Sequence, residues 1–307
     1  MSGTIIVALD GAPLAEQAIP YAESLCKRTE WRLVLVRVRS GQRSPTGTGE
    51  RLEEESYLRT LAQQLDARGL SVDTAVPQGE PAQCIADEAR LQCADVIVMA
   101  THARGGIGSW ALGSVASEVL ARSSVPVLLV RQGTGSPLFG AASPRVIVSL
   151  DGTTYAEEAL ALAESYTRML GAELVLVRVV SGRDPHGDPV LVTDGTDLRY
   201  LESPIDIGWL EAKEYLEHAV ARLAAKGVAA VSDTRVGSPA EQIAQAAREH
   251  EACLVVMATH GRRGASRVLM GSVAADVLRA VEVPLLLVRP PRAVETSQPQ
   301  PESQHLA

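Results

Sequence analysis

The sequence predicts an α/β protein made of two tandem open parallel five-stranded sheets, each with helices on both faces. Short apolar runs alternate with helix-forming segments along the 307 residues, the pattern of a parallel sheet covered by helices. Hydrophobic residues make up 46% of the chain and aromatic residues only 3%, so the cores must consist of Val, Leu, Ile and Ala. One long segment also occurs twice, which predicts two domains of roughly 150 residues each.

The repeated segment combines an apolar strand, a glycine-rich loop and a helix start. Its first copy covers Val96–Ala103 and Ala111–Val115, and its second copy covers Val255–Gly261 and Leu269–Val273. The internal spacing is the same in both copies. An α/β fold with these parts in this order presents backbone N–H groups to a phosphate.

Each predicted strand is a short apolar run bounded by polar or turn-forming residues, as expected for buried strands. The third strand of each half is the weakest and is expected near a sheet edge. In chain order, the strands are predicted at Ile5–Leu9, Leu33–Val38, Ser71–Val76, Asp95–Met99 and Pro126–Val130, and then at Val146–Leu150, Leu174–Val179, Val228–Val236, Leu254–Met257 and Pro284–Val288.

Capping signals predict the first and third helices of each half. The first helix follows an Asp-Gly pair, with Pro13 near its first turn in the first half and Thr153 or Thr154 as a cap in the second. The third helix has a proline at its first position, Pro81 or Pro239, where the missing N–H costs nothing.

The second helices are predicted at Leu52–Ala67 and Trp209–Ala225. Each ends before a glycine, Gly69 or Gly227, that can take the left-handed conformation that often terminates helices. The fourth helix of each half starts at the end of the glycine loop.

The repeat divides the chain into a first domain (1–131), a Gly/Ser/Pro-rich linker (132–144), a second domain (145–290) and a tail (291–307) that is expected to be disordered. The second half also carries an insertion, Ser181–Ile207, after its second strand. Because this position is beside the expected ligand crevice, the insertion is either a mobile lid or a surface loop.

Composition and charge narrow the functional classes. The net charge is -8 and Lys and Arg form no basic stripe, which argues against nucleic-acid binding. The four cysteines form no CxxC pair, so we expect reduced thiols in a cytoplasmic protein rather than zinc ligands. The sequence shows no signal-peptide pattern, and apolar runs of about six residues are far shorter than the ~20 needed to cross a membrane.

Polar and turn residues follow the predicted strands at their carboxyl ends, where ligands bind to open parallel sheets. Asp10 and Asp151 follow the first strands, Val38 and Val179 end the second, and the glycine loops follow the fourth. These residues can converge on one crevice in each half.

The glycine loops offer what a phosphate needs. Glycine allows close approach, and the helix starts at Gly113-Ser114 and Gly271-Ser272 add N–H donors and a positive potential. The Ser hydroxyls could donate to a phosphate or cap the helices. Other nucleotide patterns fit worse: Gly108–Ser114 has P-loop spacing but no Lys before the Ser, and Gly106-Ile107-Gly108 has no counterpart in the second half.

The aspartates and histidines of the expected crevice each have more than one interpretation. Asp10 and Asp151 could accept a hydrogen bond from a ribose hydroxyl or an adenine edge, or could form a turn that caps the next helix, which position alone favours. His102 and His260 have no second ligand-type residue repeated nearby at metal spacing. They are interpreted as loop or phosphate-facing histidines, not as metal ligands or general bases.

With these features the chain resembles a tandem universal stress protein over both halves. ATP-binding members of that family carry Gly-x2-Gly-x9-Gly-(Ser/Thr) after the fourth strand. In this register the second half reads Ala258-Thr259-His260-Gly261, nine residues and Gly271-Ser272, and the first reads Ala100-Thr101-His102-Ala103, nine residues and Gly113-Ser114. The resemblance implies a Rossmann-like fold of the adenine-nucleotide alpha-hydrolase type.

The resemblance also implies an ATP site in each half, with a Mg²⁺ that Asp10 or Asp151 could reach. The aspartates would contact adenine or ribose, the main chain at Val38 and Val179 would meet adenine, and the loops would hold ribose and phosphates. The implied residues are Asp151, Val179, Ala258, Thr259, His260, Gly261, Gly271, Ser272 and Val273 in the second half, and Asp10, Val38, Ala100, Thr101, His102, Gly113, Ser114 and Val115 in the first.

The first glycine of the family pattern is Ala in both halves, and the second is Ala103 in the first half only. Where the backbone needs positive φ, a Cβ costs on the order of 1 kcal/mol. Because about 1.4 kcal/mol is tenfold in affinity, we expect the second half to bind ATP more tightly.

Three functions remain open. The first is an ATP-binding stress or regulatory protein rather than a fast catalyst. The second is a slow ATP hydrolase or phosphotransferase, although no acidic residue repeats in the loops to hold a metal. The third is a scaffold with degenerate sites. By the resemblance, the halves would pair within the chain through Val125–Val130 and Val283–Val288, and a homodimer stays open.

Overall fold

The computed structural model describes residues 3–39, 47–101, 112–132, 134, 143–181, 190–193, 198–201, 204–259 and 270–289. The first half contains β1 (Thr4–Leu9), the 3-10 helix η1 (Ala15–Ala18), α1 (Ile19–Thr29), β2 (Arg32–Arg37), α2 (Gly47–Asp66), β3 (Val72–Ala75), α3 (Pro81–Leu91), β4 (Val96–Thr101), α4 (Ser114–Arg122) and β5 (Val127–Arg131). The second half contains β6 (Arg145–Ser149), α5 (Thr154–Leu170), β7 (Glu173–Val180), β8 (Val190–Thr193), β9 (Leu198–Leu201), α6 (Pro204–Ala225), β10 (Ala230–Val236), α7 (Pro239–Glu249), β11 (Ala252–Ala258), α8 (Ser272–Ala280) and β12 (Leu285–Val288).

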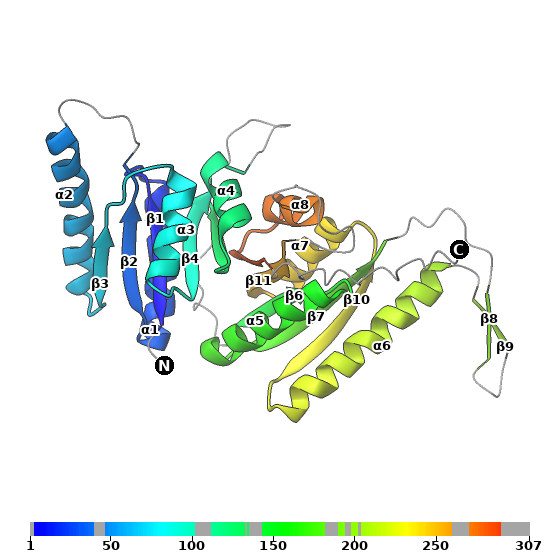
Figure 1. Cartoon of the computed structure of the whole chain (residues 1–307). Coiled ribbons are helices and arrows are strands. Elements are labelled where there is room, and N and C mark those ends of the chain that lie inside the picture. The colour runs from blue at the N-terminus through cyan, green and yellow to red at the C-terminus, as the bar shows by residue number, and fades with distance from the viewer. Residues whose placement is uncertain are drawn as a thin grey trace, which may run out of the picture.

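The strands form a ten-stranded sheet that runs through both halves (Figure 1). Its order is β10-β7-β6-β11-β12-β5-β4-β1-β2-β3, and within each half all neighbouring strands are parallel. The predicted α/β class is confirmed. The two five-stranded groups are nevertheless one sheet, because β12 pairs antiparallel with β5 and places Leu286 opposite Leu128.

The side chains of the strands alternate between two cores, one on each face of the sheet. One core lies under η1, α1, α2, α5 and α6 and includes Val7 and Val148. The other lies under α3, α4, α7 and α8 and includes Ile6 and Ile147. We call these the α1–α5 face and the α3–α7 face. Each core contains residues of both halves, so the hydrophobic interior is continuous across the β5–β12 junction.

The helix starts follow the predicted capping signals. The Thr153 hydroxyl accepts a hydrogen bond from the amide of Ala156 at the start of α5. Helices α3 and α7 begin at Pro81 and Pro239, as predicted. In the first half, by contrast, Pro13 precedes the 3-10 helix η1, and the α-helix proper begins four residues after η1 starts.

The predicted glycine terminators are also confirmed. Gly69 and Gly227 follow α2 and α6 with φ of +86° and +72°. Their N–H groups donate to the carbonyls of Asp66 and Ala224 at 2.8 and 2.9 Å. Both helices begin five residues before the predicted position, α2 at Gly47 and α6 at Pro204.

The insertion Ser181–Ile207 contains regular structure that was not predicted. Strands β8 and β9 form an antiparallel hairpin, and α6 already begins at Pro204. In Figure 1 the hairpin lies beyond the start of α6, apart from the main sheet. Residues 182–189, 194–197 and 202–203 of the insertion lie outside the described residues.

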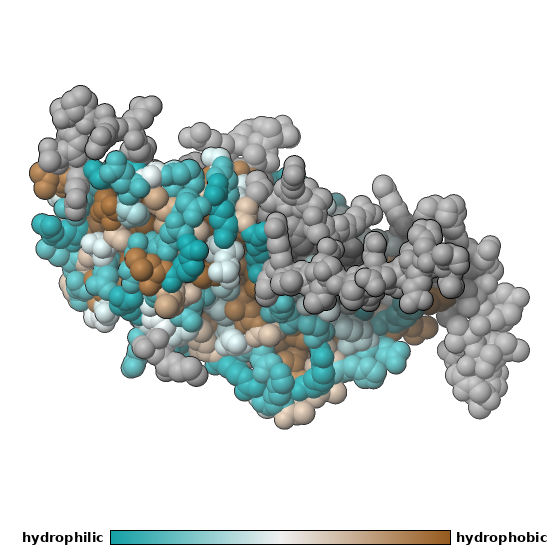
Figure 2. Space-filling model, in the orientation of Figure 1, coloured by the Kyte–Doolittle hydropathy of each residue, from teal (hydrophilic) through white to brown (hydrophobic). Residues whose placement is uncertain are grey.

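The described surface does not gather its hydrophobic residues into one area. Figure 2 shows one face on which hydrophobic residues are scattered among hydrophilic ones. The exposed large hydrophobic residues belong to α2, α3, α6, α8 and β10: Leu52, Leu91, Leu210, Val273, Val231 and Val236. Within the described part of the chain, no helix is long and apolar enough to span a membrane. The tail 291–307 and most of the linker 132–144 lie outside it.

Candidate nucleotide site at the carboxyl edge of the sheet

Each half has a topological switch point, where adjacent strands lead to helices on opposite faces. In the first half β1 and β4 are neighbours, with Ile6 opposite Ile97. The chain leaves β1 toward η1 and α1 on the α1–α5 face, and leaves β4 toward α4 on the α3–α7 face. Strands β6 and β11 repeat this arrangement with α5 and α8. The carboxyl edge at such a point is where open α/β sheets bind ligands.

The structure places the predicted first-half residues at this edge. Asp10 follows β1, Val38 follows β2, Thr101 ends β4 and Gly113 precedes α4. Val38 packs against the core of the α3–α7 face, and strand alternation puts Thr101 on the same face. The side chain of Ala100 instead packs against the opposite core, so only its main chain can reach a ligand on the α3–α7 face.

The second half repeats this division. Asp151 is the second residue after β6. Val179 lies near the end of β7 and packs on the α3–α7 face, whereas the Ala258 side chain packs on the opposite face. Thr259, Gly271, Ser272 and Val273 lie between β11 and the first turn of α8, as Ser114 and Val115 lie in the first turn of α4. His102, His260 and Gly261 lie outside the described residues.

Both Asp-Gly pairs form a turn held by the aspartate. Oδ1 of Asp10 accepts a hydrogen bond from the Ala12 amide at 2.8 Å. Oδ1 of Asp151 accepts from the amide of Thr153 at 3.0 Å and from its hydroxyl at 2.6 Å. The aspartates therefore form the predicted turns, but among the described residues they do not cap the next helix: η1 and α1 have no side-chain cap, and the cap of α5 is Thr153. The turns do not exclude a ligand contact, because an ionised carboxylate has about four lone-pair positions.

Glycine occupies the N-cap positions of α4 and α8. Gly113 and Gly271 have ψ of 144° and 149°, and neither helix start has a side-chain cap. Helix α3, in contrast, is capped by Glu80, which accepts hydrogen bonds from two first-turn amides. Ser114 and Ser272 are the first helical residues, so their hydroxyls do not take the N-cap position that the sequence left open. The uncapped N–H groups and the helix dipole favour an anion at both helix starts.

The loops of the two halves differ in their internal contacts. The Gly271 amide donates to the Thr259 carbonyl at 2.8 Å, which joins the start of α8 to the end of β11. The corresponding bond between Gly113 and Thr101 does not occur in the described part of the first half. There Thr101 is 1% exposed, and its buried hydroxyl has no hydrogen-bond partner among the described residues.

A second repeated group of residues lies beside the Asp-Gly turns and was missed in the sequence. The guanidinium of Arg37 lies over the Tyr57 ring, 4.9 Å from its centroid, and the Tyr57 hydroxyl donates to Glu16 at 2.8 Å. Arg37 also forms an ion pair with Glu54. Burial, followed by the bond to Glu16, raises the pKa of Tyr57, so the phenol stays protonated.

The second half contains the same group. Arg178 lies 4.9 Å from the Tyr215 ring centroid, and the Tyr215 hydroxyl donates to Glu157 at 2.6 Å. Glu157 also forms an ion pair with Arg222 at 2.8 Å. A residue-by-residue alignment of the two halves could have found this group, since each member recurs at the same place in the repeat.

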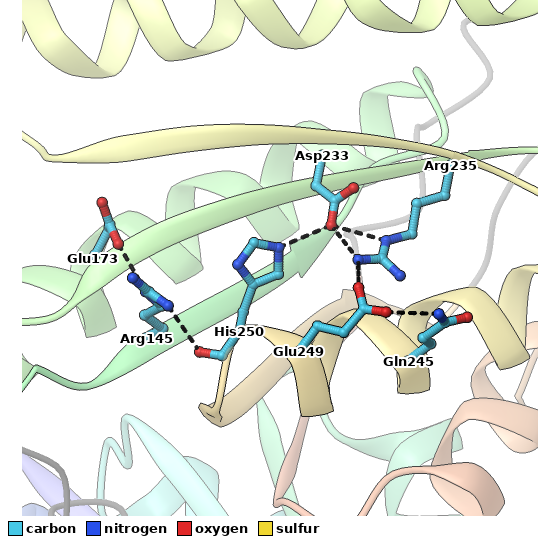
Figure 3. A network of polar contacts seen from close by, with 7 residues as sticks. All are labelled: Arg145, Glu173, Asp233, Arg235, Gln245, Glu249 and His250. Carbon is cyan, nitrogen blue, oxygen red and sulfur yellow. Dashed lines mark hydrogen bonds and ion pairs between the residues drawn. The ribbon is translucent and has the colours of Figure 1, made fainter.

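Another polar network occurs in the second half, away from the candidate site (Figure 3). Asp233 on β10 contacts His250, which follows α7, and Arg235, which also pairs with Glu249. Burial opposes ionisation of Asp233, but the hydrogen bonds from Arg235 and His250 outweigh it, so the pKa of Asp233 is lowered. In the described ranges, no group of three or more His, Cys, Asp or Glu side chains could hold a metal ion.

The fold and its two carboxyl edges define a duplicated α/β protein in which each half has a switch point, an Asp-Gly turn and a helix that starts at glycine. The sequence model of the universal stress protein family matches residues 1–131 and 143–289. The chain therefore belongs to the universal stress protein family, a family of stress-response proteins.

Individual family members resemble one half or more of the chain. A universal stress protein of Thermus aquaticus is 36% identical over 140 residues, which are 43% of this chain and 100% of that protein. A universal stress protein of Mycobacterium tuberculosis is 29% identical over 203 residues, which are 64% of this chain and 62% of that protein. The alignment thus spans less than two thirds of the mycobacterial relative.

Solved structures share the fold of the whole chain. A universal stress protein from Archaeoglobus fulgidus has a TM-score of 0.72 at 20% identity, over 94% of this chain and 99% of that chain. One solved universal stress protein is described in complex with cAMP; it is 22% identical to this chain over 42% of this chain and 97% of that chain, with a TM-score of 0.35.

Proposed function

We propose that this universal stress protein binds ATP at the carboxyl edge of each half and acts as a regulatory or protective stress-response factor rather than as a fast catalyst. One observation carries the proposal. In both halves, an Asp-Gly turn and an uncapped helix that starts with Gly-Ser follow the two strands of the switch point. Among the described residues, no side chain caps these two helices, so their first-turn amides are available to a phosphate.

The residues at each edge suit the parts of an adenine nucleotide. The amides of the first turns of α4 and α8 can donate to phosphate oxygens. Asp10 and Asp151 keep acceptor capacity for a ribose hydroxyl or an adenine amino group beyond their turn bonds. The main chain after β2 and near the end of β7 offers hydrogen bonds to adenine at Val38 and Val179. A Mg²⁺ would arrive with the nucleotide, held chiefly by its phosphates.

We also propose that residues 1–131 and 145–290 are two domains that pair within one chain. The β5–β12 ladder supports this pairing, because it joins the last strands of the halves into one sheet. The cysteines Cys26, Cys84, Cys93 and Cys253 are free thiols, which supports a reducing compartment such as the cytoplasm.

The decisive experiment identifies a co-purifying nucleotide. Freshly purified protein is denatured and the released small molecules are identified and counted by mass spectrometry. We expect ATP or ADP, at up to two molecules per chain. With nucleotide-free protein, ATP at 100 times its dissociation constant should add about 2.7 kcal/mol per occupied site to the free energy of unfolding, seen as a higher Tm. No released nucleotide and an unchanged Tm would refute ATP binding and favour a scaffold. Steady metal-dependent ADP production would instead favour a hydrolase.

A further inference from the structure

The guanidinium groups of Arg37 and Arg178 lie directly against the glycines of the Asp-Gly turns. A Cβ added to Gly11 would lie 2.7 Å from Cζ of Arg37, and a Cβ added to Gly152 would lie 3.2 Å from Nη2 of Arg178. Both glycines have positive φ, +85° and +82°. Each turn therefore needs glycine for its conformation and for the close approach of the arginine.

Each arginine lies over a tyrosine ring, and the hydroxyl of that ring is held by a carboxylate. The three residues Arg37, Tyr57 and Glu16, and their second-half counterparts Arg178, Tyr215 and Glu157, form what we call the turn-support clusters. Each ring faces its guanidinium at the same distance, 4.9 Å, and each phenol donates to its glutamate. A planar guanidinium that stacks on a ring is fixed in a way that a lysine ammonium is not.

The arginines lie on the other face of the sheet from the proposed nucleotide contacts. Along β2, Leu33 and Leu35 belong to the core of the α1–α5 face, and alternation places Arg37 on that face, over α2. Val38 packs on the α3–α7 face. The observed contact between an arginine in this position and the candidate edge is with the glycine of the turn.

We propose that Arg37 and Arg178 are positioning residues, which hold the Asp-Gly turns so that Asp10 and Asp151 are oriented for the nucleotide. This inference rests on the proposed function. Its physical basis is that the glycine follows the aspartate directly, so a guanidinium packed on the glycine restricts the backbone on which the carboxylate is mounted. Small displacements of a binding group cost large factors in affinity.

The test uses the full chain and second-half variants. Arg178→Met removes the guanidinium but keeps a long unbranched side chain, and Arg178→Lys keeps the charge without the planar group. The matched control is Arg145→Met, which removes an arginine ion-paired with Glu173 at 2.8 Å at the amino end of β6. Two quantities are measured: the dissociation constant for ATP, and the hydrogen-exchange rate of the Thr153 amide, which donates to Asp151.

We expect Arg178→Met to raise the exchange rate of the Thr153 amide and to weaken ATP binding, each about tenfold. Arg178→Lys should rescue neither, and Arg145→Met should change neither. In an Asp151→Ala background, Arg178→Met should weaken ATP binding little further, because the carboxylate that it positions is gone. The matching Arg37→Met variant should raise the exchange rate of the Ala12 amide.

Three results would overturn the inference. The first is an Arg178→Met protein with unchanged Thr153 exchange and ATP affinity. The second is full rescue by Arg178→Lys, which would make the arginine a charge rather than a support. The third is an equal loss of affinity with and without Asp151. If the wild-type protein binds no ATP, the proposed function fails and the nucleotide role of the arginines fails with it, while the exchange rates still decide whether they hold the turns.

Discussion

Nε2 of His250 lies 2.9 Å from Oδ2 of Asp233, and the same oxygen accepts from Nε of Arg235 at 2.8 Å (Figure 3). This carboxylate joins the edge strand β10 to the end of α7. Its pKa is lowered below the ordinary value of 3.8, because the two hydrogen bonds outweigh the effect of burial. A depressed carboxyl pKa contributes stability that is fully present above the unfolded value and is lost as the pH falls through the folded value.

Asp233→Asn should therefore destabilise the protein in a pH-dependent way. At pH 7 we expect a loss of about 1–2 kcal/mol in the free energy of unfolding, since two hydrogen bonds to a charged group are weakened. The difference from the wild type should begin to shrink as the pH falls below about 4, where the unfolded carboxyl becomes protonated, and it should vanish once the pH is below the lowered native pKa. Urea denaturation from pH 3 to pH 7 measures it. Glu249→Gln, which alters the exposed partner of Arg235, is the control and should have a smaller effect; a pH-independent loss in Asp233→Asn would contradict the linkage.

Two glycines with nearly the same φ allow the cost of positive φ to be measured separately from the cost of displacing an arginine. Gly11 and Gly69 have nearly equal φ, +85° and +86°, but a Cβ at Gly69 would meet nothing within 4 Å. Gly69→Ala should cost only the positive-φ penalty, about 1 kcal/mol. Gly11→Ala should cost more, because the Arg37 guanidinium must also move away from the Tyr57 ring. Thermal unfolding of the two variants measures the difference; equal losses would mean that Arg37 does not pack on the turn in solution.

The glycine N-caps allow a substitution that separates folding from nucleotide binding. Gly113→Asp places a carboxylate at a helix start that has N-cap backbone geometry, and a Cβ at Gly113 meets nothing within 4 Å. Because Asp caps helices well, stability should be kept or rise by a few tenths of a kcal/mol. The carboxylate would take the amides and repel a triphosphate, so ATP binding in the first half should be lost.

The matched variant Gly271→Asp should abolish binding in the second half only. Isothermal titration of wild-type protein and both single variants counts the remaining sites. We expect the site that remains in Gly113→Asp to be the tighter one, because the second half keeps the second glycine of the family pattern, Gly261, where the first half has Ala103. Unchanged stoichiometry in both variants would place the nucleotide elsewhere, and the reverse order of affinities would contradict the predicted inequality.

The order of the elements could be predicted from the sequence because each strand is short, apolar and bounded by turn residues. The helix signals at Thr153, Pro81 and Gly227 act on the backbone within a few residues. Such local signals can be recognised in the sequence without knowledge of tertiary contacts. The position of the candidate edge followed from the same reasoning, since Asp10 and Asp151 end the first strands of a parallel sheet.

The remaining features depend on contacts that are distant in the sequence. Arg37, Tyr57 and Glu16 come from a strand and two helices, and each alone has an ordinary explanation as a surface or half-buried side chain. Ala100 and Thr101 lie on opposite faces of the sheet because side chains alternate along β4. The family pattern names consecutive residues and does not say which face each side chain is on. The pairing of the two last strands was expected from the family resemblance alone, because the apolar composition of the strands does not specify which strand pairs with which.

That junction gives a test of the fold in solution. Leu128 and Leu286 are fully buried and lie opposite one another in the antiparallel β5–β12 ladder. Changing either to alanine should cost about 2–5 kcal/mol, as for other buried leucines. Because directly opposed side chains on neighbouring strands interact, the two losses should not add, and a double-mutant cycle should give a coupling of about 0.5–3 kcal/mol.

Leu35 provides the matched comparison for this cycle. It is also fully buried in the same core, but it lies on β2, four strands away from β12 in the sheet order. At about 4.8 Å per strand this is far beyond contact distance, so Leu35→Ala and Leu286→Ala should add to within about 0.5 kcal/mol. Chemical denaturation of the single and double variants gives both cycles. Coupling in the Leu128 cycle alone would support one continuous sheet, whereas additivity in both cycles would mean that the last strands of the two halves do not pair.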